Sequence, residues 1–210
     1  NIINLGSSCM YPRNAINPLK EEYLLQGELE PTNEGYAIAK IASQRLCEYL
    51  KIEDPSRNYI TLMPCNLYGK HDHFEKERSH LIASIIAKIH HAKINNKNEV
   101  EIWGDGKVKR EFMFVEDFAD AVWFLLLKIN DLDNIINVGT GKDYTILDYY
   151  KKVAAIIDFN GNFKFDLNKP TGMKQKLLDV KKINDLGWFP SHDLELGIKK
   201  TYSHYLDCLK

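Results

Sequence analysis

The run Ile-Ile-Asn-Leu-Gly-Ser-Ser-Cys at positions 2–9 decides the fold that we expect for this 210-residue chain. Its first four residues are mostly large and aliphatic, which is typical of a short buried strand. The strand ends at a Gly-Ser turn that carries two hydroxyls and a thiol. Residues 59–69, Tyr-Ile-Thr-Leu-Met-Pro-Cys-Asn-Leu-Tyr-Gly, repeat the pattern. Because open α/β sheets bind ligands at the carboxyl ends of their strands, the two turns predict one shared site.

Outward from these two runs, short apolar stretches alternate with longer stretches of helical spacing. We predict strands at 2–5, 59–63, 100–103, 112–115, 135–138 and 163–165. We predict helices at 36–50, 79–92, 115–129, 146–157 and 194–209. Strand and helix in alternation indicate an α/β fold.

Capping residues precede three of the predicted helices. Thr32 or Asn33 can cap the first, Ser79 can cap a helix that begins at His80, and Thr145 can cap the helix at 146–157. These boundaries agree with the apolar periodicity.

The predicted architecture is the C-terminal part of a Rossmann-like doubly wound parallel sheet, with a smaller α/β lobe that holds the substrate. We assign residues 1–70 to the sheet and 71–210 mainly to the lobe, with a strand and helix near 112–130 returning to the sheet. The 210 residues contain no G-x-x-G-x-x-G turn, which holds the pyrophosphate of a dinucleotide. We therefore expect the mononucleotide-binding half of the fold to precede Asn1.

Composition excludes several classes of protein. Lys and Arg number 28 against 29 Asp and Glu, so the net charge of -1 offers no excess positive field for nucleic acid or an anionic membrane. The apolar runs stop well short of the roughly 20 residues that span a bilayer. Four scattered cysteines, without disulfide-like spacing, favour a reducing cytoplasm.

The run Tyr36-Ala37-Ile38-Ala39-Lys40 carries the first chemical signal. Four residues along a helix is just over one turn, so the phenol and the ammonium share a face. A nearby ammonium stabilises phenolate, which suits a tyrosine that donates a proton. Ser7, Tyr36 and Lys40 could then converge on one keto oxygen. The alternative is an amphipathic helix whose lysine only reaches toward solvent.

Several longer runs carry a resemblance to a known family. They are Leu-Gly-Ser-Ser-Cys-Met-Tyr-Pro at 5–12, Leu-Gln-Gly-Glu-Leu-Glu-Pro-Thr-Asn-Glu-Gly-Tyr-Ala-Ile-Ala-Lys at 25–40, Asn-Leu-Tyr-Gly-Lys-His-Asp at 66–72, Arg-Glu-Phe at 110–112, Val-Glu-Asp at 115–117, Asn-Val-Gly-Thr-Gly at 137–141 and Lys-Leu-Leu-Asp-Val at 176–180. Together they resemble the extended short-chain dehydrogenase/reductases that act on nucleotide sugars, and within them the GDP-L-fucose synthases. The resemblance covers essentially the whole chain.

The resemblance implies roles for five residues. The family's reductase set maps onto Ser7, Tyr36 and Lys40, while Cys9 and His80 match a thiol and an imidazole that exchange protons on the carbons flanking a ketone. The residue types suit that chemistry, because a carbonyl acidifies the neighbouring C–H bonds. A structural alternative stays open for both: Cys9 could be a small buried apolar residue, and His80 could merely cap or pack.

The resemblance also implies binding residues for NADP(H) and a GDP-sugar. The expected cofactor contacts are Tyr36, Lys40, Pro64, Asn66, Leu67 and His80. The expected GDP contacts are Lys88, Trp103, Arg110 and Lys176. Lys88 stands where the family leads us to expect arginine, and Gln175 stands where we expect a basic residue. The phosphate contacts are therefore expected to differ from those of the family.

We expect no metal site. The histidine-rich runs His-Asp-His at 71–73 with Glu75, and His-His at 90–91, lack the i, i+4 pairing with a third ligand that zinc sites show.

The resemblance implies an NADPH-dependent epimerase/reductase that converts GDP-4-keto-6-deoxy-mannose to GDP-L-fucose and that, like members of that family, acts as a homodimer. One alternative is a GDP-4-keto-heptose C4 reductase with little or no epimerisation. An alternative of another class is a nucleotide-sugar-binding fragment without catalysis, because the 210 residues alone are expected to bind NADPH poorly and to be inactive. Residues Ile38, Ile41, Ala42 and Leu46 could form the dimer face or an ordinary core, and the sequence does not divide these roles.

Overall fold

A three-stranded parallel sheet forms one end of the protein. The computed structural model describes residues 1–75, 79–169 and 172–209. Strands β1 (Ile2–Leu5), β2 (Tyr59–Pro64) and β6 (Ile135–Val138) are hydrogen bonded in the order β1-β2-β6. Both pairs are parallel, with Ile2 opposite Tyr59 and Thr61 opposite Ile135. The carboxyl ends of all three strands therefore lie at one edge.

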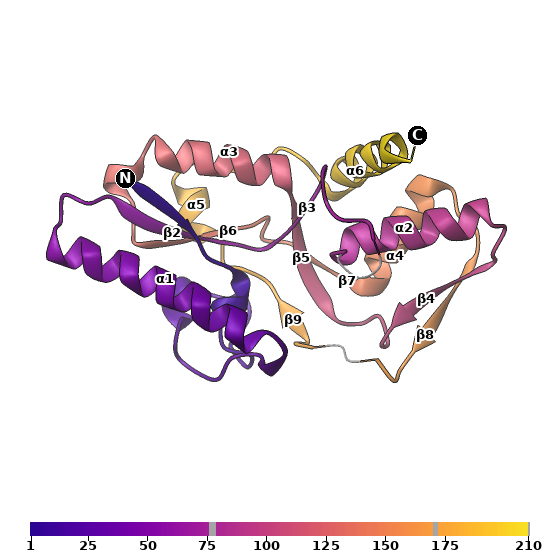
Figure 1. Ribbon diagram of the computed structural model, residues 1–210, viewed down its shortest axis with the longest axis horizontal. Coiled ribbons are helices and arrows are strands. Elements are labelled where there is room, and N and C mark those ends of the chain that lie inside the picture. Colours follow the sequence, from indigo (N-terminus) through magenta and orange to yellow (C-terminus); the bar gives the residue numbers. More distant parts are fainter. Residues whose placement is uncertain (76–78, 170–171, 210) are drawn as a thin grey trace.

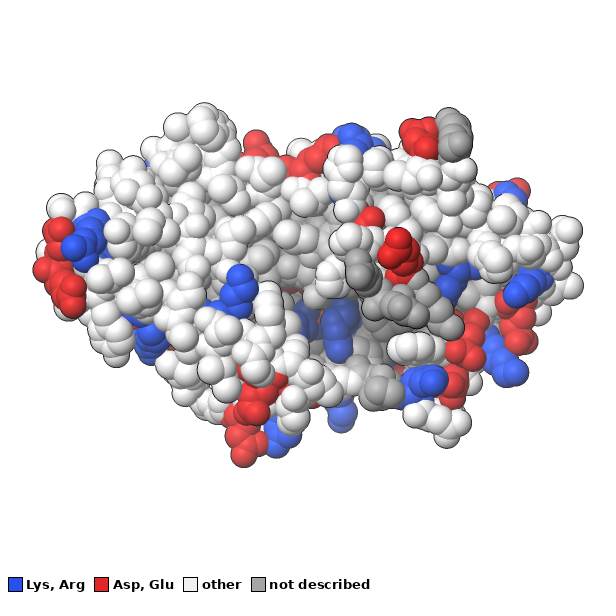
Figure 2. Space-filling view, viewed as in Figure 1, with Lys and Arg blue, Asp and Glu red and all other residues white. Residues whose placement is uncertain are grey.

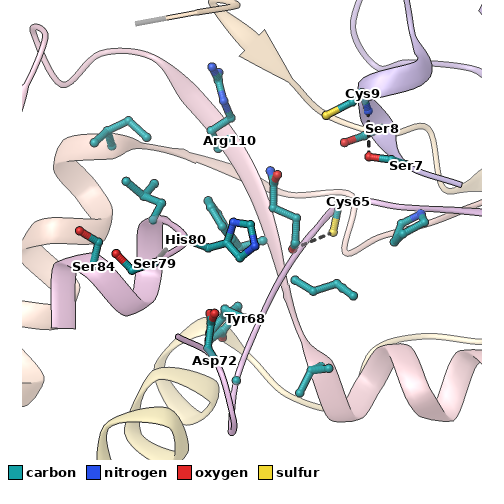
Figure 3. Close-up of a pocket in the computed structure, with 18 of the residues that line it drawn as sticks. Ser7, Ser8, Cys9, Cys65, Tyr68, Asp72, Ser79, His80, Ser84 and Arg110 are labelled. Carbon is teal, nitrogen blue, oxygen red and sulfur yellow. Dashed lines mark hydrogen bonds between the residues drawn. The ribbon is translucent and has the colours of Figure 1, made fainter. Parts of the chain in front are cut away.

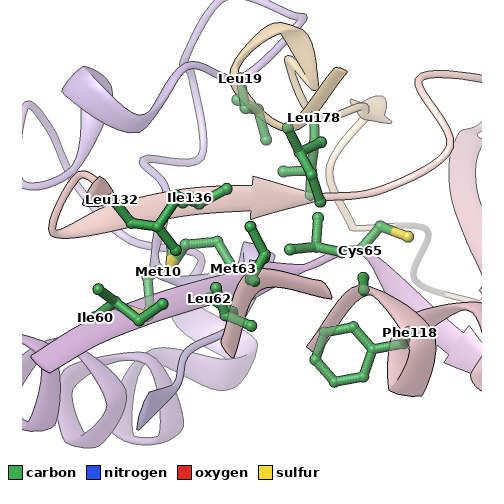
Figure 4. Packing of buried hydrophobic residues seen from close by; sticks show 14 of the residues in the cluster. Met10, Leu19, Ile60, Leu62, Met63, Cys65, Phe118, Leu132, Ile136 and Leu178 are labelled. Atoms are coloured by element: carbon green, nitrogen blue, oxygen red, sulfur yellow. The ribbon is translucent and has the colours of Figure 1, made fainter. Parts of the chain in front are cut away.

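Helices cover both faces of this sheet. Figure 1 shows α1 (Glu34–Glu53) on one side of β2 and β6, and α3 (Val115–Leu126) on the other. Their apolar sides meet the strands in a single buried cluster, in which Ile41 of α1 and Phe118 of α3 contact the sheet from opposite directions. Figure 4 shows β2 at the centre of that cluster. Removing each such side chain from water contributes about 1.5–3 kcal/mol, which fixes the helices against the sheet.

A second, mixed sheet begins where the first one ends. Its central strand β5 (Lys109–Phe114) is parallel to β3 (Asn66–Tyr68) and β9 (Gln175–Lys176) and antiparallel to β7 (Asp143–Thr145). Three helices pack beside it: α2 (Leu81–Ile94), α4 (Ile146–Ile157) and α6 (Leu194–Cys208). The parallel pair β4 (Glu99–Trp103) and β8 (Asn162–Asp166) completes this end, which has its own buried cluster. Figure 1 shows the two ends joined through β3 and β5.

Short elements fill the connections. They are α5 (Lys181–Asp185) and the 3-10 turns η1 (Ser8–Met10), η2 (Glu21–Tyr23), η3 (Pro31–Asn33) and η4 (Ile129–Asp131). Among the described residues, no helix is long and apolar enough to cross a bilayer.

The predicted α/β class and all six predicted strands are confirmed, but one topological expectation is wrong. We expected a strand near 112–130 to return to the first sheet. That region's strand, β5, pairs with β3, β7 and β9 instead, and β6 supplies the third strand of the first sheet. Only the helix from that region, α3, packs on the first sheet. The division of the chain at residue 70 stays a prediction.

Of the predicted helix caps, some are present and others are not. Thr145 caps α4 as predicted, accepting from the Asp148 N–H in a reciprocal capping box. The helix predicted to begin at His80 starts at Leu81, so His80 and not Ser79 holds the N-cap position, without a side-chain cap bond. Asn33 holds the N-cap of α1, and its side chain also makes no cap bond. Both uncapped side chains reappear in the site below.

Candidate active site

Ser7 sits at the turn that ends β1. It is the N-cap of η1, and its Oγ accepts a hydrogen bond of 3.2 Å from the Cys9 N–H. A hydroxyl that accepts in this way still has its own proton to donate. Gly6 allows the turn, because a Cβ at that position would lie 2.6 Å from Met63 Sδ on β2. The side chains of Met63, Met10 and Thr61 thus leave little room for a side chain directly before Ser7.

Helix α1 brings Tyr36 and Lys40 to the same edge. The Lys40 ammonium donates to the Leu5 carbonyl at 2.8 Å, directly before the Gly6-Ser7 turn, and lies 5.9 Å from the centre of the Tyr36 ring. Tyr36 keeps 51% of its surface exposed. The shared face predicted from the four-residue spacing is therefore present, and it meets the carboxyl end of β1.

The turn after β2 forms the neighbouring wall. Asn66 Nδ2 donates to the Glu111 carbonyl at 2.9 Å, which ties the start of β3 to β5. Cys65 beside it is buried, and that burial raises the pKa of its thiol well above the usual range. Cys65 is therefore a protonated packing residue at neutral pH.

A cavity of about 850 Å³ opens between the two ends of the molecule. In Figure 2 this face is hollowed near its middle, and Lys and Arg side chains lie inside the hollow. Most of the residues singled out in the sequence line it: Ser7, Cys9, Tyr36, Pro64, Asn66, Leu67, His80, Lys88, Trp103 and Arg110. Lys40 and Lys176 do not line it. Lys40 binds the Leu5 carbonyl, directly before the Gly6-Ser7 turn that does, and Lys176 contacts Cys9.

Cys9 and His80 approach the cavity from different elements. Figure 3 shows Cys9 with Ser7 and Ser8 on one side, and His80 with Ser79 and Ser84 on the side of α2. The His80 side chain is exposed at the helix start and makes no capping bond. Cys9 is half-buried rather than part of the core. This arrangement puts a thiol and an imidazole on separate walls of one cavity, as a two-sided proton exchange requires.

Aromatic and cationic side chains form the far end of the cavity. Trp103, at the end of β4, is 51% exposed, and the Lys88 ammonium lies 5.2 Å from its ring centre and 3.4 Å from the Tyr150 hydroxyl. An exposed indole offers a stacking surface for a base, and ammonium groups attract phosphate.

The Arg110 guanidinium lies within electrostatic range of Cys9. Its guanidinium donates to the Met173 carbonyl at 2.6 Å. Burial lowers the pKa of Arg110, and the Cys9 sulfur and the Glu30 carboxylate oppose that shift. A partly buried guanidinium of this kind is suited to an anionic ligand.

The two residues near 175 have partners of their own. Lys176 is buried, and its ammonium lies 3.5 Å from Cys9 Sγ. Gln175 donates to the Asp143 carboxylate at 2.6 Å. The sequence indicated that phosphate contacts would be unusual here, and the described side chains of this strand are engaged with protein groups.

Glu111 joins three segments of the chain next to the cavity. Its side chain has no exposed surface and accepts from the backbone N–H groups of Thr140 (2.6 Å), Gly141 (2.8 Å) and Leu178 (2.9 Å). Burial raises the pKa of Glu111 to about 6, and these hydrogen bonds act in the opposite direction. One carboxylate thus joins β5, the turn after β6 and the segment that carries Lys176.

The histidine-rich runs have structural surroundings. His90 Nδ1 lies 3.0 Å from the Tyr202 hydroxyl, and the His71 ring packs edge-on against His204. Over the described ranges 1–75, 79–169 and 172–209, no group of three His, Cys, Asp or Glu side chains could hold a metal ion.

Sequence reasoning missed several residues of the site. Tyr68, Asp72, Ser84 and Tyr150 line the cavity, and Asn33 donates to Cys9 Sγ at 3.2 Å. Asn33 had a signal in the sequence as a candidate helix cap three residues before Tyr36, and Tyr68 and Asp72 lie in the run 66–72 that carries the family resemblance. Ser84 and Tyr150 reach the cavity through the packing of α2 and α4, which no local sequence pattern indicates.

A parallel sheet with helices on both faces defines a Rossmann-like chain. Ser7 follows the carboxyl end of β1, and Tyr36 and Lys40 lie on the helix beside it, so a hydroxyl, a phenol and an ammonium gather at the edge of the sheet where such folds bind ligands. The chain belongs to the NAD dependent epimerase/dehydratase family, whose sequence profile matches residues 1–139. The family resemblance drawn from the sequence is thereby confirmed.

Two relatives and one solved structure illustrate the similarity. The chain is 49% identical over 206 residues to GDP-L-colitose synthase of Yersinia pseudotuberculosis, covering 98% of this chain and 67% of that protein. It is 48% identical over 205 residues to GDP-L-fucose synthase of Azorhizobium caulinodans, covering 98% and 65%. The chain thus spans about two thirds of the length of these relatives. A GDP-mannoheptose C4 reductase from Campylobacter jejuni, solved with NADP bound, superposes with a TM-score of 0.86 at 35% identity, covering 97% of this chain and 69% of that one.

Proposed function

We propose that this protein is an NADP(H)-dependent epimerase/reductase that converts GDP-4-keto-6-deoxy-mannose to GDP-L-fucose. One observation carries the proposal: a proton-donating set, a thiol and an imidazole share a cavity whose far end offers an indole and cations. The names of the relatives at 48–49% identity support a GDP-linked deoxy sugar as the substrate.

The residues present fit the cofactor. The cavity begins at the carboxyl ends of parallel strands, where Rossmann-like sheets hold nucleotides. Tyr36, Pro64, Asn66, Leu67 and His80 line the cavity and would hold the nicotinamide end, with Lys40 beside Tyr36. When bound, the reduced nicotinamide supplies the hydride for the ketone carbon.

The chain's own residues would move the protons of the reduction. Ser7 donates its hydroxyl proton as a hydrogen bond to the keto oxygen, and Tyr36 delivers a proton to that oxygen as it becomes an alcohol. Lys40, fixed by its bond to Leu5, stabilises the phenolate that remains.

Cys9 and His80 would carry out the epimerisation. One of them removes the proton from a carbon beside the ketone, and the electron pair of that C–H bond moves onto the keto oxygen. The other returns a proton to the opposite face and so inverts the centre. Their places on separate walls of the cavity support this division of roles.

The test is to incubate the full-length protein with NADPH and GDP-4-keto-6-deoxy-mannose and to identify the product by NMR. We expect consumption of NADPH and formation of GDP-L-fucose. Binding of the sugar nucleotide without turnover by the full-length protein would instead support the non-catalytic reading and contradict the proposal.

A second candidate rests on the similarity to a GDP-heptose reductase. In this version the protein reduces a GDP-4-keto-heptose at C4 with little or no epimerisation. Running the reaction in deuterated water separates the two candidates, because an epimerase incorporates deuterium beside the ketone and a pure reductase does not. GDP-linked precursors of colitose belong in the same substrate panel, given the name of the 49% relative.

We also propose a homodimer in the cytoplasm. The apolar side chains Ile38, Leu46, Tyr49 and Ile52 form an exposed stripe along α1, while Ile41 is buried in the core. A stripe of this kind fits a second copy of the same helix. The four cysteines are all unpaired, which fits a reducing compartment.

A further inference from the structure

The sulfur of Cys9 receives N–H groups from two segments that lie far apart in the sequence. Asn33 Nδ2 lies 3.2 Å from Cys9 Sγ, and Lys176 Nζ lies 3.5 Å from it. The Arg110 guanidinium is also close: burial lowers the pKa of Arg110, and the Cys9 sulfur opposes that shift. A half-buried thiol surrounded by donors and positive charge differs from a packing cysteine such as Cys65, whose buried sulfur contacts the neighbouring Asn66 carbonyl.

Asn33 reaches the sulfur at the expense of its ordinary local role. An asparagine at an N-cap usually accepts a hydrogen bond from the first turn, which stabilises the helix by about 1 kcal/mol. Here the N-cap side chain makes no such bond, and its Oδ1 is buried without a partner among the described residues. Because an amide carries a donor and an acceptor side by side, Asn33 can accept from a thiol or donate to a thiolate.

The position of Lys176 is set by the fold rather than by its own flexibility. β9 pairs with β5 so that Lys176 lies opposite Arg110, and two residues later the Leu178 N–H is held by Glu111 at 2.9 Å. The Lys176 side chain is 9% exposed. A buried ammonium is stable only when it is paired or hydrogen bonded, and a thiolate at Cys9 would supply the opposite charge.

We propose that Asn33 and Lys176 are positioning residues that hold Cys9 as a thiolate aimed at the sugar carbon beside the ketone. This inference rests on the proposed function. The thiolate takes the proton from that carbon, the C–H electron pair moves onto the keto oxygen, and the resulting thiol later releases its proton to solvent. Neither residue touches the sugar in this role, since both act through the sulfur.

The test measures the reactivity of Cys9 without any substrate. The full-length protein is treated with iodoacetamide, a neutral reagent, at a fixed neutral pH, and alkylation of each cysteine is followed by peptide mass spectrometry. In Lys176→Met the Cys9 sulfur loses the ammonium that contacts it at 3.5 Å, so we expect Cys9 to react about three- to tenfold more slowly. Lys176→Arg keeps the charge and should restore the rate to within about twofold.

Controls separate this effect from a loss of structure. Lys174→Met removes an exposed lysine from the same segment and should leave the Cys9 rate unchanged. Buried Cys65 reports folding, because it becomes reactive only if a variant unfolds. If Lys176→Met unfolds, the Asn33→Ala variant serves as the test instead. Slower alkylation of Cys9 in Asn33→Ala supports the proposal, and an unchanged alkylation rate overturns it.

An unchanged Cys9 rate in folded Lys176→Met would likewise overturn the proposal. Because alkylation requires neither NADPH nor a sugar nucleotide, this result is independent of whether the proposed reaction occurs.

Discussion

Glu111 is a carboxylate without exposed surface that nevertheless organises three segments of the chain. The N–H groups of Thr140, Gly141 and Leu178 all point at its oxygens. Leaving any of these donors without an acceptor costs about 1–3 kcal/mol, so the side chain stabilises the fold although it does not line the cavity.

Replacing Glu111 with glutamine should lower the free energy of unfolding by about 1–3 kcal/mol, because the amide NH₂ then faces a backbone N–H. Urea unfolding followed by circular dichroism measures the change. Glu195→Gln, at an exposed position on α6, is the matched control and should have little effect. Equal stability of both variants would contradict the structural role of Glu111.

Because Glu111 is buried, we also expect the free energy of unfolding to depend on pH. Its pKa rises from 4.5 to about 6 on folding, so protonation of Glu111 stabilises the native state. That contribution, roughly 2 kcal/mol, is fully present below pH 4.5 and is lost as the pH rises through about 6. Unfolding measured across this window should show the loss in the wild-type protein and not in Glu111→Gln. Identical profiles would show that another group is responsible.

Tyr36 supports a prediction about activity alone. Because its ring is half exposed, Tyr36→Phe should leave the stability within about 0.5 kcal/mol of the wild-type value. Removing a positioned proton donor should lower kcat about 10²–10⁴-fold with little change in KM. Steady-state kinetics of the full-length protein tests this, with Tyr49→Phe on the same helix as the control. A kcat within a few-fold of wild type would remove Tyr36 from the reaction.

At the scale of single elements, α6 depends on close contact with β3. A Cβ added at Gly197 would lie 2.9 Å from Tyr68 Cζ, whereas one at Gly35, in the first turn of α1, would meet nothing within 4 Å. Both glycines are helical, so alanine improves helix propensity at both positions.

Gly197→Ala should therefore destabilise the protein by about 1–3 kcal/mol, because overpacking outweighs propensity. Gly35→Ala should stabilise it by about 0.5–1 kcal/mol. Thermal unfolding of the two variants measures the difference. Stabilisation by both substitutions would show that α6 can move away from β3 without cost.

One face of helix α1 is buried and the other is exposed. Ile41 packs on the sheet, while Ile38, Leu46, Tyr49 and Ile52 remain exposed. Leu46→Glu should convert the proposed dimer to a monomer, as measured by light scattering after size-exclusion chromatography, because a charge would have to be buried in the interface. Trp123→Glu, on the exposed face of α3, is the control. A wild-type monomer, or a Leu46→Glu dimer, would rule this face out.

At the scale of the whole molecule, the cavity lies between two separate cores. Ser7 and Tyr36 belong to the end built around the parallel sheet, and Lys88 and Trp103 belong to the other. A GDP-sugar that fills the cavity would therefore contact both ends at once, with its base near Trp103 and its sugar near Tyr36.

Trp103→Ala should weaken GDP binding about tenfold, since stacking of a base on an aromatic ring contributes roughly 1–3 kcal/mol. Isothermal titration calorimetry with GDP measures the affinity, and Trp123→Ala, an exposed tryptophan outside the cavity, is the matched control. Equal affinity of the two variants would place the base elsewhere.

The sequence alone determined those features that depend on neighbouring residues. Three features are local patterns: the strand and turn at 2–9, the helix that carries Tyr36 four residues before Lys40, and the cap at Thr145. Interactions between residues close in sequence stabilise each of them. The edge of the sheet at which Ser7, Tyr36 and Asn66 meet followed from them, because parallel strands place their carboxyl ends together.

Only the tertiary structure decided the rest. Lys176 lies 167 residues from Cys9 in sequence, and the three-residue strand β3 acquires its partners only through β5. The core position of Ile41, next to an exposed Ala42, depends equally on what packs against α1. Contacts between distant segments form because together they give the folded chain the most burial and hydrogen bonding. A short stretch of neighbouring residues carries no information on that total.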